Sequence, residues 1–307
     1  MIHTGFKKPV IDHTHYRLGL GQVPSVILKE SGNWEDNLPA FEPQSKDGFD
    51  TFNCTGFGTA SHIEDLLSYL VQENKFSVDL IKWFIDNKYI KRVDKENLKP
   101  ITVQEVLLEP LSFYFDIADR WIGIISGTSV KSGGNDPQTV YEAVRNNGLI
   151  PESMLPFDDT ITTPEEYYSF KGADKEACYA LAEVFKEKID FLHEWTFLPD
   201  QPMEEKLNNI KVALKYSPLA IAVYAWATDE RGVYVAIGEP NHWTVMYNCD
   251  QFQRIFDTYE PFKKALEQDL VYCKRIYIAE KKSPVVTKSV WQDFLEWLLK
   301  LLNTFKW

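Results

Sequence analysis

The feature that most constrains the fold is a change of pattern near residue 216. Before it, apolar residues recur every three or four positions, as on one face of an α-helix, in the segments 55–73, 77–87, 102–125, 137–147, 175–193 and 203–216. After it, short runs rich in β-branched and aromatic residues predict strands in the segments 218–225, 232–239, 242–249, 253–259 and 271–280. A chain that is helical first and β-rich second predicts an α+β fold with two segregated lobes.

Charge and cysteine usage exclude several classes of protein. The net charge of −12 argues against a nucleic-acid partner, because phosphate binding requires clustered Lys and Arg. The four cysteines are too scattered for a disulfide framework and contain no CxxC pair, which argues against a structural zinc site. His13 and His15 lie two residues apart but have no third ligand close in sequence. We expect no metal and no cofactor. The first residues lack the apolar run of a signal peptide. We therefore expect a cytoplasmic protein, or a virion-associated one if the chain is phage-encoded.

Cys54 lies in the stretch FDTFNCTGFGTA, directly before the first helical pattern. The first N–H groups of a helix lack partners within the helix, and its dipole is positive there. Both effects favour thiolate over thiol, so Cys54 is a candidate nucleophile with a depressed pKa. The alternative is that Cys54 is a small apolar filler, as most free cysteines are. Taken alone, this stretch favours the filler.

A cysteine nucleophile needs a base and a group that orients the base. His242 begins the strand-like run HWTVMYN, and Asp257 follows fifteen residues later. A strand, a turn and a second strand would return Asp257 to the imidazole. His62 is a rival base, but eight residues along a helix from Cys54 is about 12 Å, too far for proton transfer.

In this order, the motifs resemble the papain-like cysteine peptidases over residues 35–280. The segments that carry the resemblance are LPAFEPQ with FNCTGFGTA, SGGNDPQTVYEAVRNNGLIPESMLPF, IKVALKYSPLAIAVYA, HWTVMY and FDTY. The local phrases FDTFNCT, SGTS and NGLIPE also resemble peptidases predicted from bacteriophage and environmental genomes. The resemblance therefore points to a diverged member of the family.

The resemblance implies a two-lobed peptidase over residues 1–280. Its helical lobe would span about 45–215, with the cysteine on a central helix. Its β-rich lobe would span about 216–280, with part of the N-terminal segment, and would carry the histidine and the aspartate.

The family also implies roles for individual residues in a cysteine endopeptidase acting on polypeptides. Cys54 would be the nucleophile, His242 the base and Asp257 the group that orients the ring. The side chain of Gln44 and the backbone N–H of Cys54 would form the oxyanion hole. Gly133 and Gly134 would run beside the substrate backbone. Trp243 would pack beside the catalytic pair, or be an ordinary core aromatic.

Several positions depart from the family pattern. The usual second cysteine before the nucleophile and the tryptophan after it are missing. Gln44 lies ten residues before Cys54, which is further than usual, and Asp257 stands where asparagine is more common. Cys54 and His242 are 188 residues apart, against about 130–150 in papain-type enzymes. We expect the surplus in residues 75–125 and 158–200.

Two alternatives remain open at this point. One is acyl transfer or amidase chemistry with the same cysteine. The other is a catalytically silent papain-like fold that serves as a structural or binding component of a larger assembly, such as a phage particle.

The C-terminal segment has its own pattern. After a charged linker at 281–289, residues 290–307 predict an amphipathic helix. Its apolar face comprises Trp291, Phe294, Leu295, Leu298, Leu301, Leu302 and Phe305. Charges throughout the segment argue against a bilayer span, and the near balance of acidic and basic residues disfavours contact with anionic lipid. We therefore expect the stripe to contact protein, either within the chain or through self-association.

Overall fold

The computed structural model describes residues 5–46, 48–94, 96–224, 227–235 and 239–282. The helix predicted at 290–307, together with most of the linker before it, lies outside the described residues.

Helices account for much of the chain before residue 214. The α-helices are α1 (Cys54–Gln72), α2 (Val78–Asp86), α3 (Val103–Leu108), α4 (Asp119–Ile125), α5 (Pro137–Asn147), α6 (Pro164–Tyr167), α7 (Lys175–Lys188) and α8 (Met203–Ala213). Short 3-10 turns are η1 (Glu35–Asn37), η2 (Pro110–Ser112) and η3 (Glu152–Met154).

Strands occur in both halves of the chain. They are β1 (Ser45–Lys46), β2 (Phe49–Asp50), β3 (Ile90–Arg92), β4 (Phe113–Phe115), β5 (Ile189–Trp195), β6 (Leu219–Val223), β7 (Ala227–Thr228), β8 (Tyr234–Val235), β9 (His242–Cys249), β10 (Gln253–Phe256), β11 (Lys263–Glu267) and β12 (Cys273–Glu280).

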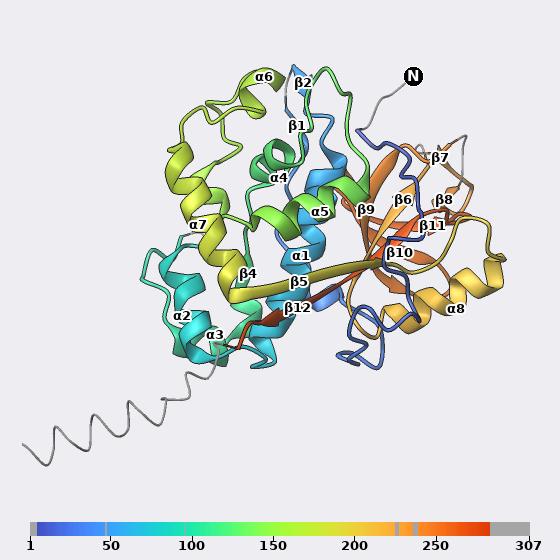
Figure 1. Cartoon of the computed structure of the whole chain (residues 1–307), viewed down its shortest axis with the longest axis horizontal. Coiled ribbons are helices and arrows are strands. Elements are labelled where there is room, and N and C mark those ends of the chain that lie inside the picture. Colours follow the sequence, from blue (N-terminus) through green and yellow to red (C-terminus); the bar gives the residue numbers. More distant parts are fainter. Residues whose placement is uncertain (1–4, 47, 95, 225–226, 236–238, 283–307) are drawn as a thin grey trace, which may run out of the picture.

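Within the described residues, one sheet of eight strands has the order β5-β12-β6-β9-β10-β11-β8-β7. Its neighbouring strands are antiparallel, except that β11 and β8 run parallel. Figure 1 shows α2, α6 and α7 on one side of α1 and strands β8 to β11 on the other. The architecture is therefore α+β, with α1 between the helices and the sheet.

The sequence prediction is correct for several elements and wrong for two. Helix α5 spans the predicted residues, with the Asp136 side chain capping its start and Gly148 following its end. The predicted helix at 175–193 is too long, because the helix ends at Lys188 and residues 189–195 form β5. The predicted helix at 102–125 is replaced by α3, η2, β4 and α4. In both places a strand forms because a distant strand pairs with it, namely β12 for β5 and β3 for β4.

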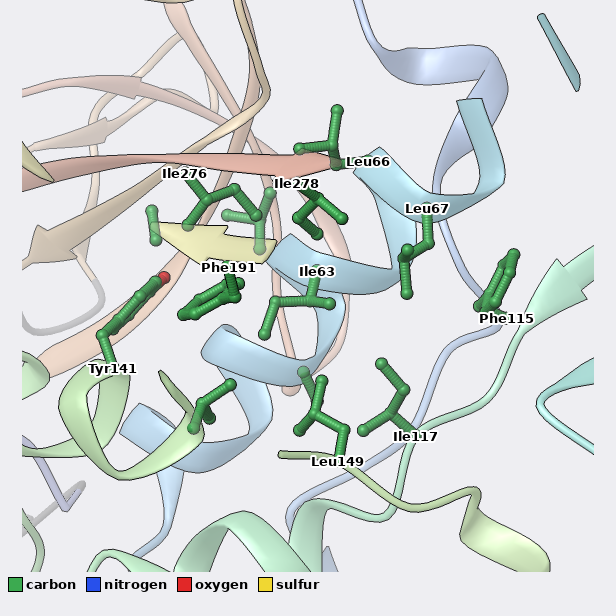
Figure 2. Close-up of a cluster of buried hydrophobic side chains, with 14 of the residues drawn as sticks. Ile63, Leu66, Leu67, Phe115, Ile117, Tyr141, Leu149, Phe191, Ile276 and Ile278 are labelled. Atoms are coloured by element: carbon green, nitrogen blue, oxygen red, sulfur yellow. The ribbon is translucent and has the colours of Figure 1, made fainter. Parts of the chain in front are cut away.

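Helix α1 is the centre of the core. Every residue of α1 except Ser61 and Gln72 is buried, as expected of a helix packed on all sides. Figure 2 shows Ile63, Leu66 and Leu67 of α1 together with Phe191 of β5 and Ile278 of β12 in the cluster of buried apolar side chains. This burial fixes the helix that begins at Cys54.

Gly58 lets α1 approach the beginning of β9. A Cβ atom at Gly58 would lie 2.9 Å from the Trp243 carbonyl oxygen, closer than packed side chains allow. The absence of a side chain at Gly58 therefore lets the beginning of α1 approach Trp243 of β9.

Candidate active site

Cys54 is the first residue of α1, and the residue before it is held from two sides. The Asn53 side chain does not cap the helix. Instead, its Nδ2 donates to the Asp119 carbonyl oxygen at 3.1 Å and to the Tyr167 hydroxyl at 2.7 Å. Tyr167 in turn donates to the Asp119 carboxylate. Asn53 therefore ties the entry of α1 to α4 and α6.

The environment of the Cys54 thiol differs from the sequence expectation of a depressed pKa. Complete burial raises the pKa of Cys54 well above its ordinary value, and the negative charges of Asp50 and Asp257 add to this effect. The backbone N–H groups of Trp243 and Thr55 lower the pKa, but less than burial raises it. The helix start thus acts in the expected direction, and desolvation outweighs it.

His242 and Asp257 form a buried pair of ionisable groups at the start of β9. His242 Nε2 lies 2.6 Å from Asp257 Oδ1, and both side chains are fully buried. The pairing of β9 with β10 brings the end of β10 back toward the start of β9, as the strand–turn–strand interpretation predicts. Because Asp257 engages Nε2, Nδ1 is the ring atom that could exchange a proton with a thiol.

Lys264 is a member of this cluster that sequence reasoning missed. Its Nζ forms an ion pair with Asp257 Oδ2 and donates to the Tyr259 carbonyl oxygen at 2.6 Å. Burial alone would raise the pKa of Asp257, but the charges and hydrogen bonds of His242 and Lys264 outweigh burial and leave the pKa below its ordinary value. A signal did exist, because Lys264 and Leu266 share the buried face of β11.

Gln44 is buried beside the loop that follows β10. Its Nε2 donates to Asp50 Oδ1 at 3.1 Å and to the Tyr259 hydroxyl at 2.6 Å. Its Oε1 accepts from the Thr258 hydroxyl at 2.9 Å. Both amide hydrogens of Gln44 are thereby engaged, so donation to an oxyanion would require one of these bonds to break.

The glycine loop at 133–134 contacts the chain's own residues 5–7. The Asn135 N–H donates to the Gly5 carbonyl oxygen, and the Lys7 N–H donates to the Asn135 carbonyl oxygen, each at 2.9 Å. A Cβ atom at Gly134 would lie 2.0 Å from the Gly5 oxygen, and one at Gly5 would lie 2.0 Å from the Phe52 oxygen. An extended backbone therefore lies between this loop and the residue two positions before Cys54.

The Trp243 ring is packed as a core side chain. It is fully buried, and its ring centroid lies 6.0 Å from that of Phe6, 6.4 Å from Tyr141 and 6.5 Å from Trp195. The backbone N–H of Trp243 acts on the Cys54 sulfur. Trp243 thus acts on the Cys54 thiol through its backbone N–H, while its ring packs against Phe6.

His62, the rival base, is engaged elsewhere. Its Nε2 lies 2.8 Å from the Pro218 carbonyl oxygen and its Nδ1 lies 2.6 Å from the Tyr141 hydroxyl. Because a carbonyl oxygen only accepts, Nε2 carries the proton and Nδ1 accepts from Tyr141. Burial lowers the pKa of His62 to about 3. These contacts make His62 a neutral structural histidine.

The described part of the chain contains neither a candidate metal site nor a candidate membrane-spanning helix. There, no group of three or more His, Cys, Asp or Glu side chains is arranged to hold a metal ion. None of the helices in the same residues combines the length and apolar character needed to cross a bilayer.

Comparison with known proteins found similar solved structures. Xylellain, a cysteine protease from Xylella fastidiosa, is 11% identical with a TM-score of 0.48, over 91% of this chain and 96% of that one. Digestive procathepsin L 3 from Tenebrio molitor larval midgut is 10% identical with a TM-score of 0.46, over 86% and 76%. The proform of the ragweed pollen cysteine protease Amb a 11 is 11% identical with a TM-score of 0.44, over 87% and 69%.

No protein-family model matches the chain, and no curated protein matches it. The three TM-scores lie below 0.5 and the identities are 10–11%.

Proposed function

We propose that the chain is a papain-like cysteine endopeptidase of a diverged kind, resembling those of phage and environmental genomes. The observation that carries the proposal is the buried His242–Asp257 hydrogen bond of 2.6 Å at the start of β9. The helix that begins at Cys54 packs against this same point, because Gly58 permits the close approach. A thiol, an imidazole and an orienting carboxylate are the three groups that thiol hydrolysis requires.

In the proposed reaction, Cys54 Sγ gives its proton to His242 Nδ1, and the thiolate attacks the peptide carbonyl carbon. The imidazolium then protonates the leaving amine as the C–N bond breaks, which leaves a thioester on Cys54. Water, deprotonated by His242, hydrolyses the thioester to a carboxylic acid and the free thiol. Asp257 keeps the ring in the tautomer that presents Nδ1 to sulfur.

The substrate class follows from the loop at 133–135. An extended backbone already exchanges two hydrogen bonds with Asn135, so the loop offers one donor and one acceptor to a peptide. Such pairing recognises main chain whatever the side chains are. We therefore infer a polypeptide substrate. The Cys54 backbone N–H and Gln44 would stabilise the oxyanion after one Gln44 bond is released.

A second candidate function is favoured by one observation. Cys54 and His242 are both fully buried in this arrangement, as they would be in a silent fold retained as a component of a larger assembly. An active-site thiol probe separates the two functions. If the chain is a peptidase, the probe should label each chain once, on Cys54, and this label should disappear in His242→Ala. Labelling that His242→Ala leaves unchanged supports the silent component.

A matched control uses the same probe on Cys178→Ser. Cys178 is buried in α7, on a different element from the candidate site. If the chain is a peptidase, this variant should be labelled to the same extent as the wild type. Loss of the label in His242→Ala would then report on the base and not on a general change in thiol exposure.

A further inference from the structure

The pairing of β10 with β11 brings a lysine to the carboxylate that orients the imidazole. In the register of these strands Lys264 lies opposite Ile255, and the Asp257 N–H donates to the Phe262 carbonyl oxygen at 2.7 Å. Only 1% of the Lys264 side chain and none of the Asp257 side chain is exposed. The two charges therefore face each other away from water.

The Asp257–Lys264 pair affects the charge beside the His242 imidazole. The papain-like family, which the sequence resembles, more commonly has a neutral asparagine at the position of Asp257. A buried carboxylate is costly unless it is paired. An unbalanced one would also hold a proton on the imidazole too tightly for transfer to a leaving amine. An ammonium on the second oxygen removes most of that excess charge.

We propose that Lys264 is a positioning residue of the candidate site, which balances the charge of Asp257 so that the carboxylate orients His242 much as a neutral amide would. The proposal rests on the proposed function for its catalytic meaning. The contacts of Lys264 support it directly: one hydrogen bond fixes Nζ on the Tyr259 carbonyl oxygen, and the ion pair fixes it on Asp257.

The other groups around His242 are polar or titratable and belong to several elements. The Tyr259 ring centroid lies 5.3 Å from that of His242, and Asp257, the partner of His242, also acts on the Cys54 thiol of α1. Asp50 contacts Tyr259 from β2, and Tyr234 of β8 lies with its ring centroid 5.8 Å from Lys264 Nζ. Apart from Asp257 itself, none of these groups changes in the variants below, so the variants isolate the Asp257–Lys264 pair.

The test compares Lys264→Met, Asp257→Asn and the double variant by NMR titration of the His242 imidazole and by kcat/KM. Lys264→Met leaves the carboxylate unbalanced and should raise the imidazole pKa by about one unit, as for a neighbouring charge. Asp257→Asn leaves the ammonium unbalanced and should lower the pKa. The imidazole pKa of the double variant should lie between those of the two single variants. Its kcat/KM should be at least about tenfold higher than that of Lys264→Met.

Two controls cover folding. Lys206→Met removes another buried lysine, whose Nζ lies 3.5 Å from Asp269, and it should leave the His242 pKa unchanged. Lys264→Arg keeps the charge and should keep the pKa near that of the wild type. An imidazole pKa that is the same in Lys264→Met and wild type overturns the proposal. The pKa can be read even if the chain cleaves nothing, a result that would instead overturn the proposed function.

A groove at the end of α1 away from Cys54 supports a second proposal, which does not depend on the first. It has a volume of about 420 Å³ and lies between α1, the end of β12 and the segment 24–28. Its apolar lining includes Val26, Leu28, Leu66, Leu70, Phe76 and Tyr277. Val26 is 50% exposed, so the rim of the groove is an uncovered apolar surface.

The described chain ends at this groove. Lys282 lines it, and the pairing of β12 with β6 stops at Arg275. The linker residues 283–289 can span about 24 Å when extended, enough to bring residue 290 back over the groove.

We propose that the apolar stripe of residues 290–305 occupies this groove in the same chain. Truncation after Lys282 should raise hydrogen exchange at residues 75–77 and leave a less soluble monomer. Val26→Glu in the full chain should raise the same exchange, whereas Val10→Glu, at a position 81% exposed, should not. Unchanged exchange on truncation overturns the proposal. So does a full-length dimer that truncation dissociates, or tight binding of the full chain to anionic vesicles.

Discussion

His242 at the start of β9 and Asp257 directly after β10 meet at 2.6 Å, because the antiparallel pairing brings these two positions to the same end of the strand pair. The hydrogen bond forms on Nε2, so the orientation of the ring about this bond decides which groups Nδ1 can reach. The proposed proton transfer from Cys54 therefore depends more on this pair than on any other contact.

Substitution of His242 should reduce turnover more than substitution of Asp257. His242→Ala removes the base and should abolish turnover, whereas Asp257→Ala removes only the orienting group and should leave a remnant reduced about 10²- to 10⁴-fold. Steady-state hydrolysis of a peptide substrate measures both. His62→Ala is the control, because losing its two buried hydrogen bonds costs stability but should not change the turnover of the folded protein. Equal and negligible effects of His242→Ala and Asp257→Ala would show that the triad is misassigned.

The segment at residues 5–7 should limit access to Cys54. Gly5 has a positive φ of 94°, and a side chain there would overlap the Phe52 oxygen. Gly5→Val should therefore displace the segment. The rate of alkylation of Cys54 by iodoacetamide should rise about tenfold, which corresponds to a free-energy difference of about 1.4 kcal/mol. Gly21→Val is the matched control, since Gly21 has a φ of 71° with nothing within 4 Å of its added Cβ. A similar rate increase in both variants would contradict the prediction.

The same displacement should change the pH dependence of the Cys54 reaction. Burial is the largest cause of the raised pKa of Cys54, so exposing the sulfur should lower that pKa and leave the helix start and the imidazole to favour the thiolate. We expect the alkylation profile of Gly5→Val to move to lower pH than that of the wild type. A profile that moves to higher pH, or does not move, would show that burial is not what holds the thiol neutral.

Gln44 provides a test of the oxyanion hole that separates catalysis from packing. Gln44→Ala should reduce kcat by about 10²- to 10³-fold, the usual cost of one oxyanion donor. Thr258→Val removes the hydrogen bond to Gln44 Oε1 but no oxyanion donor, so kcat should change far less. If the two variants lose stability and kcat in parallel, Gln44 has a structural role only.

Asp119 should make stability depend on pH. Burial raises the pKa of its carboxyl to about 7, above the ordinary value of about 3.9 in an unfolded chain. The folded state therefore binds more protons than the unfolded state between these values. The stabilisation is fully present below about pH 4 and is lost as the pH rises through about 7. Thermal unfolding should show a smaller loss of Tm from pH 5 to pH 8 in Asp119→Asn than in the wild type. An equal loss in both would contradict this.

The local elements of the site were predictable because short-range signals fix them. Apolar spacing located α1 to within one residue, and the β-branched and aromatic residues of HWTVMYNC located β9. Residues 189–195 follow a helical segment without a glycine or proline break, so the strand there depends on β12, about 80 residues later in the chain. Lys264 was missed for a similar reason, since only the β10–β11 register shows which carboxylate it meets. The contact of Gly5 with Phe52 and Gly134 has no local signal.

Cleavage of a peptide library by the wild type, with Cys54→Ser and Cys178→Ser assayed at equal concentration, shows whether the chain is a peptidase with Cys54 as its nucleophile. We expect internal cleavage of peptides by the wild type and by Cys178→Ser, and none by Cys54→Ser. Cleavage that persists in Cys54→Ser would contradict the assignment of the nucleophile. A wild-type chain that cleaves nothing, with Gly5→Val equally inactive, would contradict the peptidase.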